Sequence, residues 1–572
     1  MIRWPIQLLF RLLALPFRLV FGVLKRLRMG RRPLVEVVIG GGKRPGLAER
    51  AEMLRVLELV RQDARVRVLC LDIQGVDMGL AAAKSLRDAL LAIRASGTRV
   101  LARMDSADDR SMYLASAADE VWMPPGGELH LTGLAAPMMF YGEAIGRLGL
   151  SVEIEAAGVY KSFGEPYFRA YPSRANREAT NGVLQGLHEH IQEVLAQSRG
   201  RTVEEIDLAS RTGPFSADQA AEMGLVDKVG YPDEMADVIE EYLSGRPRRM
   251  DLDQYRRRRR MSDWLGRLGR SRQHVAVLYL QGAVVERAGR VGRAKRVIAS
   301  DDVVPVLDAL RDNAQIKGVV LVIDSPGGSA LASDLIARSV ERLRSEKPVV
   351  SVMDCVAASG GYYIAAPTNE IIANESTLTG SIGVIGGKVV FGGALGAMGI
   401  HVEKVGPGAD AGMYGAHEGF TADQRRRFRA SLKRVYGRFI AVVAAGRERS
   451  EEEILKVAEG RVWTGSQAVD NGLVDHIGGL PVALERLREL ADLGDAKIGQ
   501  IPFPFDPPRW SFLNMALGRA QVQKPTAAGL ALDAVGPAAL FLEQVMDSPL
   551  QAQAIEAVPW DEAAWETWRQ SP

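Results

Sequence analysis

A serine between glycines is the first residue in this chain with the surroundings of a nucleophile. Ser359 lies in Ala358-Ser359-Gly360-Gly361, directly after the apolar stretch VVSVMDCVA and at the start of a helical pattern. A serine at that point is exposed near a helix N-terminus, and the glycines let a substrate backbone approach closely. The alternative interpretation is that Ser359 only caps the helix and the glycines serve the turn.

A second glycine-rich segment follows another apolar stretch. The sequence Asp324-Ser325-Pro326-Gly327-Gly328-Ser329 ends a predicted strand and opens a helix. Backbone N–H groups of the two glycines can face a ligand there, as in an oxyanion hole. The two segments together would suit acyl transfer.

The chain matches itself at an offset of 250 residues, which predicts two tandem copies of one fold. Identical residues at equivalent positions run from the pair Ala82 and Ala332 to the pair Gly158 and Gly408. The tetrapeptide Gly-Leu-Val-Asp recurs at 224–227 and 472–475.

The two copies differ at the candidate chemical residues. The position of Ser359 is Asp109 in the first copy, and Gly327 and Gly328 become Asp77 and Met78. Features needed for folding would be present in both copies, so their joint loss from one suggests a role outside folding. Conversely, Lys161 of the first copy falls on Ala411 of the second. The second copy thus carries a candidate nucleophile and the first a candidate base.

A lysine can take a proton from serine only when it is neutral. With an ordinary pKa of about 10.4, only about one lysine in 2,500 is neutral at pH 7. Lys161 could serve as this base if it lay in an apolar cleft between the two halves, where loss of hydration would lower its pKa. The alternative is a surface lysine before a turn.

Strands and helices that alternate along each copy predict the elements that position these residues. The first copy reads as a strand, RVRVLCLDI, a helix through LRDALLAIRASG and a second strand, TRVLARMD. The second copy reads in the same order as IKGVVLVIDS, a helix through DLIARSVERLRSEK and PVVSVMD. Continuous apolar strands that alternate with helices indicate a mostly parallel sheet covered on both faces. The predicted fold class is α/β for both halves.

Composition excludes several classes of protein. The 572 residues include 72 basic and 70 acidic side chains, so the whole chain has no bias toward nucleic acid. The two cysteines, Cys70 and Cys355, lie in apolar stretches, and the seven histidines show no metal-ligand spacing. We expect no disulfide, no metal and no cofactor.

The chain divides into five predicted segments. Residues 1–33 are apolar with Arg11, Arg18 and Lys25 spaced seven apart, which indicates an amphipathic helix lying in a membrane interface; packing of that helix on its own protein is the alternative. Residues 34–245 form the first copy and 274–500 the second. Residues 246–273 are expected to be a basic connector without strand signals, and 501–572 an irregular tail.

The motifs ASGGYY, DSPGGS, LTGSIG and VYKS resemble those of signal peptide peptidase A, of serine peptidase family S49, and the resemblance covers nearly all of residues 40–500. The long form of that family is similarly duplicated, and its fold is like that of crotonase and Clp protease. The resemblance implies that Ser359 is the nucleophile and Lys161 the general base. It further implies that Ser381 hydrogen-bonds the lysine and that Gly327 and Gly360 form the oxyanion hole.

The same resemblance implies a membrane-associated endopeptidase that degrades remnant signal peptides at the bacterial inner membrane, on a side that the sequence does not indicate. Its partners would be peptide substrates, membrane lipid and further copies of itself in a ring-like oligomer, a tetramer in the family, with no nucleic acid. Two alternatives stay open. An acyl-CoA hydratase or isomerase uses the same α/β unit and a similar oxyanion hole, and an inactive membrane scaffold could keep the fold.

Overall fold

The computed structural model describes residues 33–42, 45–267, 274–288, 297–408, 410–494 and 499–503. The predicted amphipathic helix at 1–33 lies outside these residues apart from Pro33, which begins the first strand. Within the described part of the chain, none of the helices combines the length and the apolar character that crossing a membrane requires.

The first repeat begins with the strand at Pro33. Its elements are, in order, β1 (Pro33–Gly40), α2 (Leu47–Arg61), β2 (Val68–Gln74), α3 (Leu80–Ala95), β3 (Arg99–Met104), β4 (Ser106–Asp108), α4 (Asp109–Ala115), β5 (Glu120–Met123), β6 (Glu128–His130), α5 (Gly142–Arg147), β7 (Ser151–Ala157), the 3-10 helix η1 (Glu165–Tyr167), α6 (Arg174–Arg199), α7 (Val203–Thr212), β8 (Phe215–Ser216), α8 (Ala217–Glu222), β9 (Lys228–Val229), α9 (Pro232–Leu243), β10 (Arg248–Asp251) and α10 (Leu252–Arg267).

The second repeat follows the same plan. Its elements are β11 (His274–Gln281), β12 (Val284–Val285), β13 (Ile298–Ala299), α12 (Ser300–Asp312), β14 (Ile316–Ser325), α13 (Ala330–Arg344), β15 (Val349–Ala358), α14 (Gly360–Ala365), β16 (Glu370–Ala373), β17 (Leu378–Gly380), β18 (Val384–Val390), α15 (Gly392–Ala397), α16 (Ala422–Gly446), α17 (Glu451–Val457), β19 (Val462–Thr464), α18 (Gly465–Asp470), β20 (His476–Ile477), α19 (Leu480–Leu490) and β21 (Gly499–Phe503).

The two main sheets have the same strand order, which confirms the predicted α/β class and its duplication. The first runs β10-β1-β2-β3-β5-β9, and the second runs β21-β11-β14-β15-β16-β20 with β17 and β19 branching from β15. In each sheet, neighbouring strands along this row of six are parallel. The near-continuous apolar strand IKGVVLVIDS of β14 is buried on both faces along residues 319–323, as a parallel strand covered by helices must be.

The segment 246–273, expected to be a connector, contributes structure to the first repeat. Arg248–Asp251 forms β10 and pairs in parallel with β1, and the helix α10 follows. Three of the four β10 residues are exposed, so this edge strand lacks the apolar signal of the central strands. At the other end, β21 spans the expected boundary at residue 500 and pairs with β11 as β10 pairs with β1.

The repeated Gly-Leu-Val-Asp tetrapeptide ends each repeat with the same contact. The carboxylate of Asp227 accepts a hydrogen bond from the backbone N–H of Val121 at 2.7 Å, and Asp475 accepts one from Ile371 at 2.7 Å. Each aspartate also pairs with an arginine from the preceding long helix, Arg199 or Arg447 respectively. The tetrapeptide therefore serves the fold of both copies.

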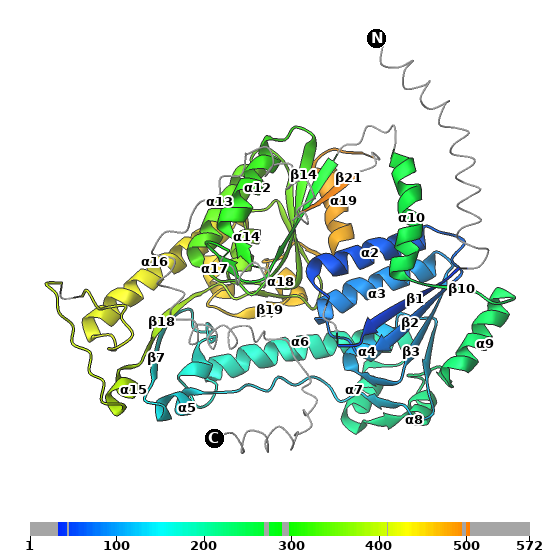
Figure 1. Ribbon diagram of the computed structural model, residues 1–572, viewed down its shortest axis with the longest axis horizontal. Helices are drawn as coiled ribbons and strands as arrows, with labels where there is room; N and C mark the ends of the chain where they lie inside the picture. The colour runs from blue at the N-terminus through cyan, green and yellow to red at the C-terminus, as the bar shows by residue number, and fades with distance from the viewer. Residues whose placement is uncertain are drawn as a thin grey trace, which may run out of the picture.

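The repeats pack closely against each other (Figure 1). Strand β7 of the first repeat pairs antiparallel with β18 of the second, from Ser151 opposite Val390 to Ala157 opposite Val384. Helix α2 enters the core of the second repeat, where Leu47 is buried with residues of β11, β14 and β15. The first and second copies are therefore joined both by a shared two-stranded sheet and by a common apolar core.

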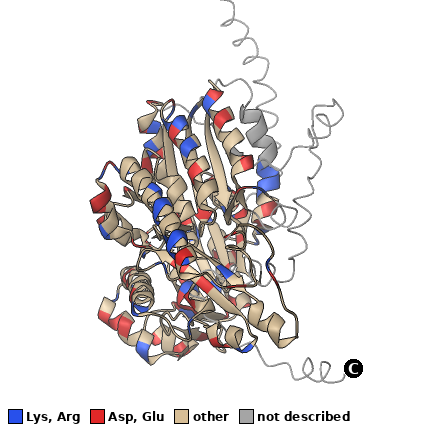
Figure 2. Cartoon of the chain, turned by 90° about the vertical axis from the view of Figure 1, so that its left-hand side faces the viewer, with Lys and Arg blue, Asp and Glu red and all other residues tan. Residues whose placement is uncertain are grey.

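Charged residues of both signs lie along the same helices (Figure 2). In α16, the guanidinium of Arg425 bonds to Glu153 and Glu155 of β7, each at 2.8 Å, and Arg429 bonds to Glu155 at 2.6 Å. These ion pairs cross between the repeats, so they fix the strand β7 against the second repeat.

Candidate active site

Ser359 stands between β15 and α14, where the chain turns sharply. Its backbone has φ 53° and ψ −116°, a conformation that costs energy for a residue with a side chain. The backbone N–H of Ser359 donates to the carbonyl of Gly380 at 2.9 Å, which holds the turn. The side chain makes no capping hydrogen bond to α14 and is partly exposed. Ser359 is therefore not a helix cap, and its hydroxyl is available for another contact.

That contact is with Lys161 of the other repeat. Lys161 follows β7 by four residues, and its Nζ lies 3.0 Å from Ser359 Oγ. The same Nζ lies 2.8 Å from the carbonyl oxygen and 3.0 Å from Oγ of Ser381. The structure thus brings Lys161, Ser359 and Ser381 together at one point, although 198 positions separate the first two in the chain.

Burial decides the charge of the lysine. The side chain of Lys161 is buried, and loss of hydration lowers its pKa from 10.5 to about 7. The three oxygens that contact its Nζ belong to neutral hydroxyl or carbonyl groups, so none of them restores the charged form as a carboxylate would. Near neutral pH a large fraction of the amine is therefore unprotonated.

A neutral amine has two N–H bonds and one lone pair. The carbonyl oxygen of Ser381 can only accept, so it takes one N–H, and Ser381 Oγ can take the other. The lone pair then faces Ser359 Oγ, whose O–H donates to it. This assignment of protons leaves the amine oriented to remove the proton of Ser359.

Ser381 is itself held from both sides. It has φ 51°, and its backbone N–H donates to the carbonyl of Arg461 at 2.7 Å. Its neighbour Gly380 accepts from Ser359, so one loop contacts both the serine and the lysine. This loop follows β17 and fixes the distance between the two groups.

The two glycines expected at the oxyanion hole lie beside Ser359. Gly327 has φ 100°, and a Cβ placed on it would lie 2.7 Å from the nitrogen of Gly360 and 2.7 Å from Ser359 Cβ. Gly360 is the first residue of α14, where a helix leaves its N–H groups without an internal acceptor. The N–H of Gly327 donates to Ser325 Oγ at 3.1 Å in this structure. The missing side chain at Gly327 keeps the space over the N–H of Gly360 open.

The corresponding place in the first repeat is closed. Asp109, which replaces the serine, is buried, and its carboxylate accepts from the backbone N–H groups of Thr132 and Gly133 at 3.2 Å each. Burial raises the pKa of Asp109. Its oxygens are used to hold the neighbouring loop, so this repeat carries no comparable hydroxyl.

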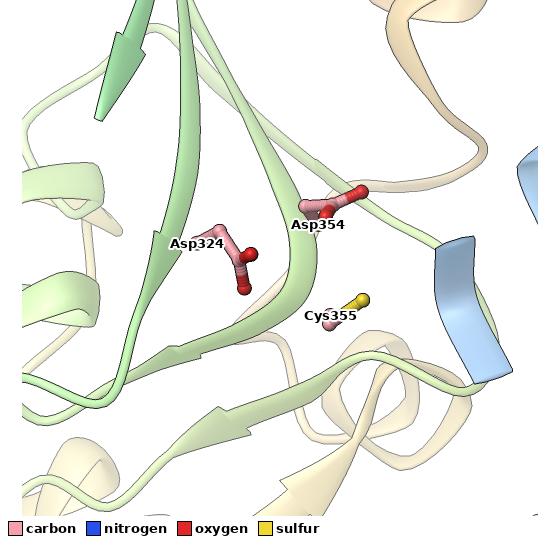
Figure 3. Close-up of side chains that lie close together, drawn as sticks. All are labelled: Asp324, Asp354 and Cys355. Carbon is pink, nitrogen blue, oxygen red and sulfur yellow. The ribbon is translucent and has the colours of Figure 1, made fainter. Parts of the chain in front are cut away.

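Two carboxylates and a thiol gather on the neighbouring strands β14 and β15 (Figure 3). Asp324 comes from β14, and Asp354 and Cys355 from β15, with their ligand atoms within 4.8 Å of one another. Such a group could hold a metal ion, but the guanidinium of Arg50 bonds to both carboxylates. A cation is thus already supplied by the first repeat.

Burial raises the pKa values of two groups in this cluster, Asp324 and Cys355, beside the cation Arg50. Burial and the nearby Asp354 raise the pKa of Asp324 to about 6, while Arg50 opposes that shift. Burial, followed by the two carboxylates, raises the pKa of the Cys355 thiol, so Cys355 is not a second nucleophile. The sequence gives no signal for Arg50, because its partners Asp324 and Asp354 lie 274 and 304 positions further along the chain.

Comparison with known proteins agrees with this geometry. The family model described as "Peptidase family S49" matches residues 92–245 and 341–494, one match in each repeat. "Serine protease SPPA, chloroplastic" from Arabidopsis thaliana is 28% identical over 75% of this chain and 64% of its own length. "Protease 4" from Salmonella typhi is 30% identical over 77% of this chain and 72% of its own length. A relative from Enterococcus faecium, provisionally named signal peptide peptidase SppA, is 31% identical over 40% of this chain and 67% of its own length.

A tandem α/β fold with a serine hydroxyl beside a buried amine defines the class of serine hydrolases. The chain belongs to peptidase family S49, a family of serine proteases. The α/β fold class and the duplicated organisation expected from the resemblance are confirmed. The chain spans just under two thirds of the plant relative's length.

Proposed function

We propose that this protein is a serine endopeptidase in which Ser359 is the nucleophile and Lys161 the general base. The observation that carries the proposal is the 3.0 Å contact between Lys161 Nζ and Ser359 Oγ, made by a lysine whose pKa is lowered to about 7. Hydratases and isomerases that act on acyl-CoA typically work with carboxylates, so the amine and hydroxyl pair favours acyl transfer through an acyl-enzyme.

In the acylation half of the reaction, the proton of Ser359 passes to Lys161 as Oγ attacks the carbonyl carbon of the scissile peptide bond. The carbonyl oxygen becomes an oxyanion, which accepts a hydrogen bond from the N–H of Gly360 and one from Gly327 once that group turns from Ser325. The C–N bond then breaks, and the ammonium of Lys161 gives its proton to the departing amine. An ester on Ser359 remains.

In the deacylation half, Lys161 takes a proton from water, and the hydroxide formed attacks the ester carbonyl. The C–O bond to Ser359 breaks, and the lysine returns the proton to the serine oxygen. Ser381 accepts N–H bonds from Lys161 in its neutral form and keeps the amine directed at Ser359 through both halves.

The proposed substrates are remnant signal peptides, in agreement with the provisional name of the Enterococcus faecium relative. The cationic and apolar pattern of residues 1–33 supports a location at the bacterial inner membrane, because such helices lie in the interface between lipid and water. Assembly into a homo-oligomer, a tetramer in the family, rests on the sequence resemblance.

The test is covalent labelling followed by cleavage. A fluorophosphonate probe should label the wild-type protein at Ser359 and should fail to label Ser359→Ala. A synthetic signal peptide in detergent or lipid should be cut internally by the wild type, and acyl-CoA should stay unchanged. Turnover of acyl-CoA without peptide cleavage would contradict the proposal, and so would full cleavage by Ser359→Ala.

A further inference from the structure

Glu459 joins the chain segment before Lys161 to the second repeat. Six residues other than glycine have positive φ in the described chain: Ser244, Ser359, Ser381, Glu448, Glu459 and Asp492. Two of them are the serines around Lys161. Glu459 follows the end of α17, at a position where helices commonly place glycine. Glutamate has a higher conformational energy than glycine at positive φ, so the presence of Glu459 here suggests a role for its side chain.

The side chain of Glu459 contacts the chain segment that carries the lysine. Its Oε2 accepts a hydrogen bond from the backbone N–H of Val159 at 3.0 Å. Its backbone carbonyl accepts from the N–H of Tyr160 at 2.7 Å. Both amides directly precede Lys161. The Val159 side chain is 72% exposed, so apolar burial of that side chain does not hold this segment.

Close backbone packing completes the contact. A Cβ on Gly158, which has φ 110°, would lie 2.6 Å from the carbonyl carbon of Glu459. A Cβ on Gly460 would lie 2.5 Å from the backbone nitrogen of Lys161. The two glycines let the segments 158–161 and 459–460 approach until their backbones touch.

The other side of the same segment fixes Ser381. The N–H of Gly460 donates to the carbonyl of Ile382 at 2.8 Å, and the carbonyl of Arg461 accepts from Ser381 at 2.7 Å. Glu459 itself is held by Tyr436 of α16, whose hydroxyl accepts from the N–H of Glu459 at 3.2 Å and donates to its Oε1 at 3.4 Å. Residues 459–461 therefore lie between the loop of Lys161 and the loop of Ser381.

We propose that Glu459 is a positioning residue for the general base, which its carboxylate holds by accepting from the N–H of Val159. The base and the nucleophile belong to different repeats, and the ladder between β7 and β18 ends at Ala157, four residues before Lys161. Glu459 of the second repeat extends the contact between the repeats from the end of that ladder to the lysine. The inference rests on the proposed function, because it takes Lys161 as the base.

The experiment compares three variants of the full chain. Glu459→Ala removes the acceptor, and Glu459→Gln keeps an oxygen that can accept from Val159. Glu448→Ala is the matched control, because Glu448 also follows the end of a helix, has φ 53° against 51° for Glu459, and forms its ion pair with Arg344. Steady-state kinetics on a signal peptide, the pH profile of kcat/KM and the Tm are measured for each variant.

We expect Glu459→Ala to lower kcat about 10- to 100-fold with little change in KM, because a small displacement of a catalytic group has that effect. The rise of kcat/KM with pH should move to higher pH as water reaches Lys161. Glu459→Gln should recover most of kcat, and both alanine variants should lose a similar amount of Tm.

Three results would overturn the inference. They are wild-type kcat in Glu459→Ala, a Glu459→Gln variant as slow as the alanine, and a loss of activity that matches the fraction of unfolded protein. Lys161→Ala separates this failure from that of the proposed function. If Lys161→Ala is inactive while Glu459→Ala is fully active, only the role of Glu459 is wrong; if Lys161→Ala is active, the proposed dyad is wrong.

Discussion

Lys161 Nζ lies 3.0 Å from Ser359 Oγ, and the two residues belong to different copies of one repeated fold. The lysine comes from the turn after β7, and the serine from the turn between β15 and α14. Both reach the site because β7 and β18 pair across the two repeats. Each repeat therefore depends on the other for one half of the pair.

Removal of either member of the pair should stop peptide cleavage. We expect Ser359→Ala and Lys161→Ala each to lower kcat/KM by at least about a thousandfold, because the hydroxyl and the amine act as a unit. Ser359 is partly exposed, so its substitution leaves no cavity of consequence and Tm should stay within a few degrees of the wild type. Cleavage of a signal peptide and thermal unfolding are the measurements. Substantial activity in either variant would contradict the assignment.

The rate should rise with pH through neutrality. Lys161 acts as a base only when neutral, and its pKa is lowered to about 7 by burial. We therefore expect kcat/KM to increase about tenfold per pH unit well below pH 7 and to level off above it. The measurement is kcat/KM between pH 5 and 9 with a substrate that does not titrate there. A profile that still climbs tenfold per pH unit at pH 9 would show that the lysine keeps its ordinary pKa.

The same lowered pKa makes Lys161 costly for folding. The unfolded chain binds a proton on this lysine up to about pH 10.5, whereas the folded chain releases it above about pH 7. Stability therefore rises with pH between these values, and the cost is greatest below pH 7. We expect Lys161→Met to have a higher Tm than the wild type at pH 6, with a smaller difference at pH 9. An equal difference at both values would argue against a lowered pKa.

A methyl group at Gly327 should block the reaction. Gly327 has φ 100°, and the added carbon of Gly327→Ala would lie 2.7 Å from the nitrogen of Gly360. The variant should lose at least about a hundredfold in kcat, because the N–H of Gly360 would no longer reach an oxyanion. Gly146→Ala is a suitable control, since Gly146 lies in α5 and its added carbon would meet open space. Equal activity in both variants would remove Gly327 from the site.

The ion pairs of Arg50 should be important for stability. Arg50→Met leaves the partly buried carboxylates of Asp324 and Asp354 without their cation, and loss of one partner from such a pair costs up to about 3–5 kcal/mol. Arg61→Met is the control, because its pair with Glu58 is exposed and should be worth less than about 1 kcal/mol. Denaturant unfolding of both variants gives the comparison. Similar losses would show that the cluster around Arg50 is not an important contact between the repeats.

Local sequence determined much of the fold. The stretch IKGVVLVIDS is the strand β14, and VVSVMD lies within β15, because apolar side chains in strands buried on both faces leave a continuous signal. The segment Arg248–Asp251 was not recognised as a strand, since edge strands face solvent and tolerate polar residues. The sequence predicts the end of the second repeat at residue 500, whereas β21 extends to Phe503.

The sequence by itself also indicated Ser359 and Lys161 as candidate chemical residues, because the two copies differ at these positions while much of the pattern repeats. Only the tertiary structure decided that these two side chains meet, since the pairing of β7 with β18 joins segments far apart in the chain. Only the tertiary structure removed water from Lys161, and a pKa depends on the surroundings of a group rather than on its neighbours in sequence. Arg50 and Glu459 likewise have no signal in the sequence, because each contacts the other repeat, where no local pattern marks a partner.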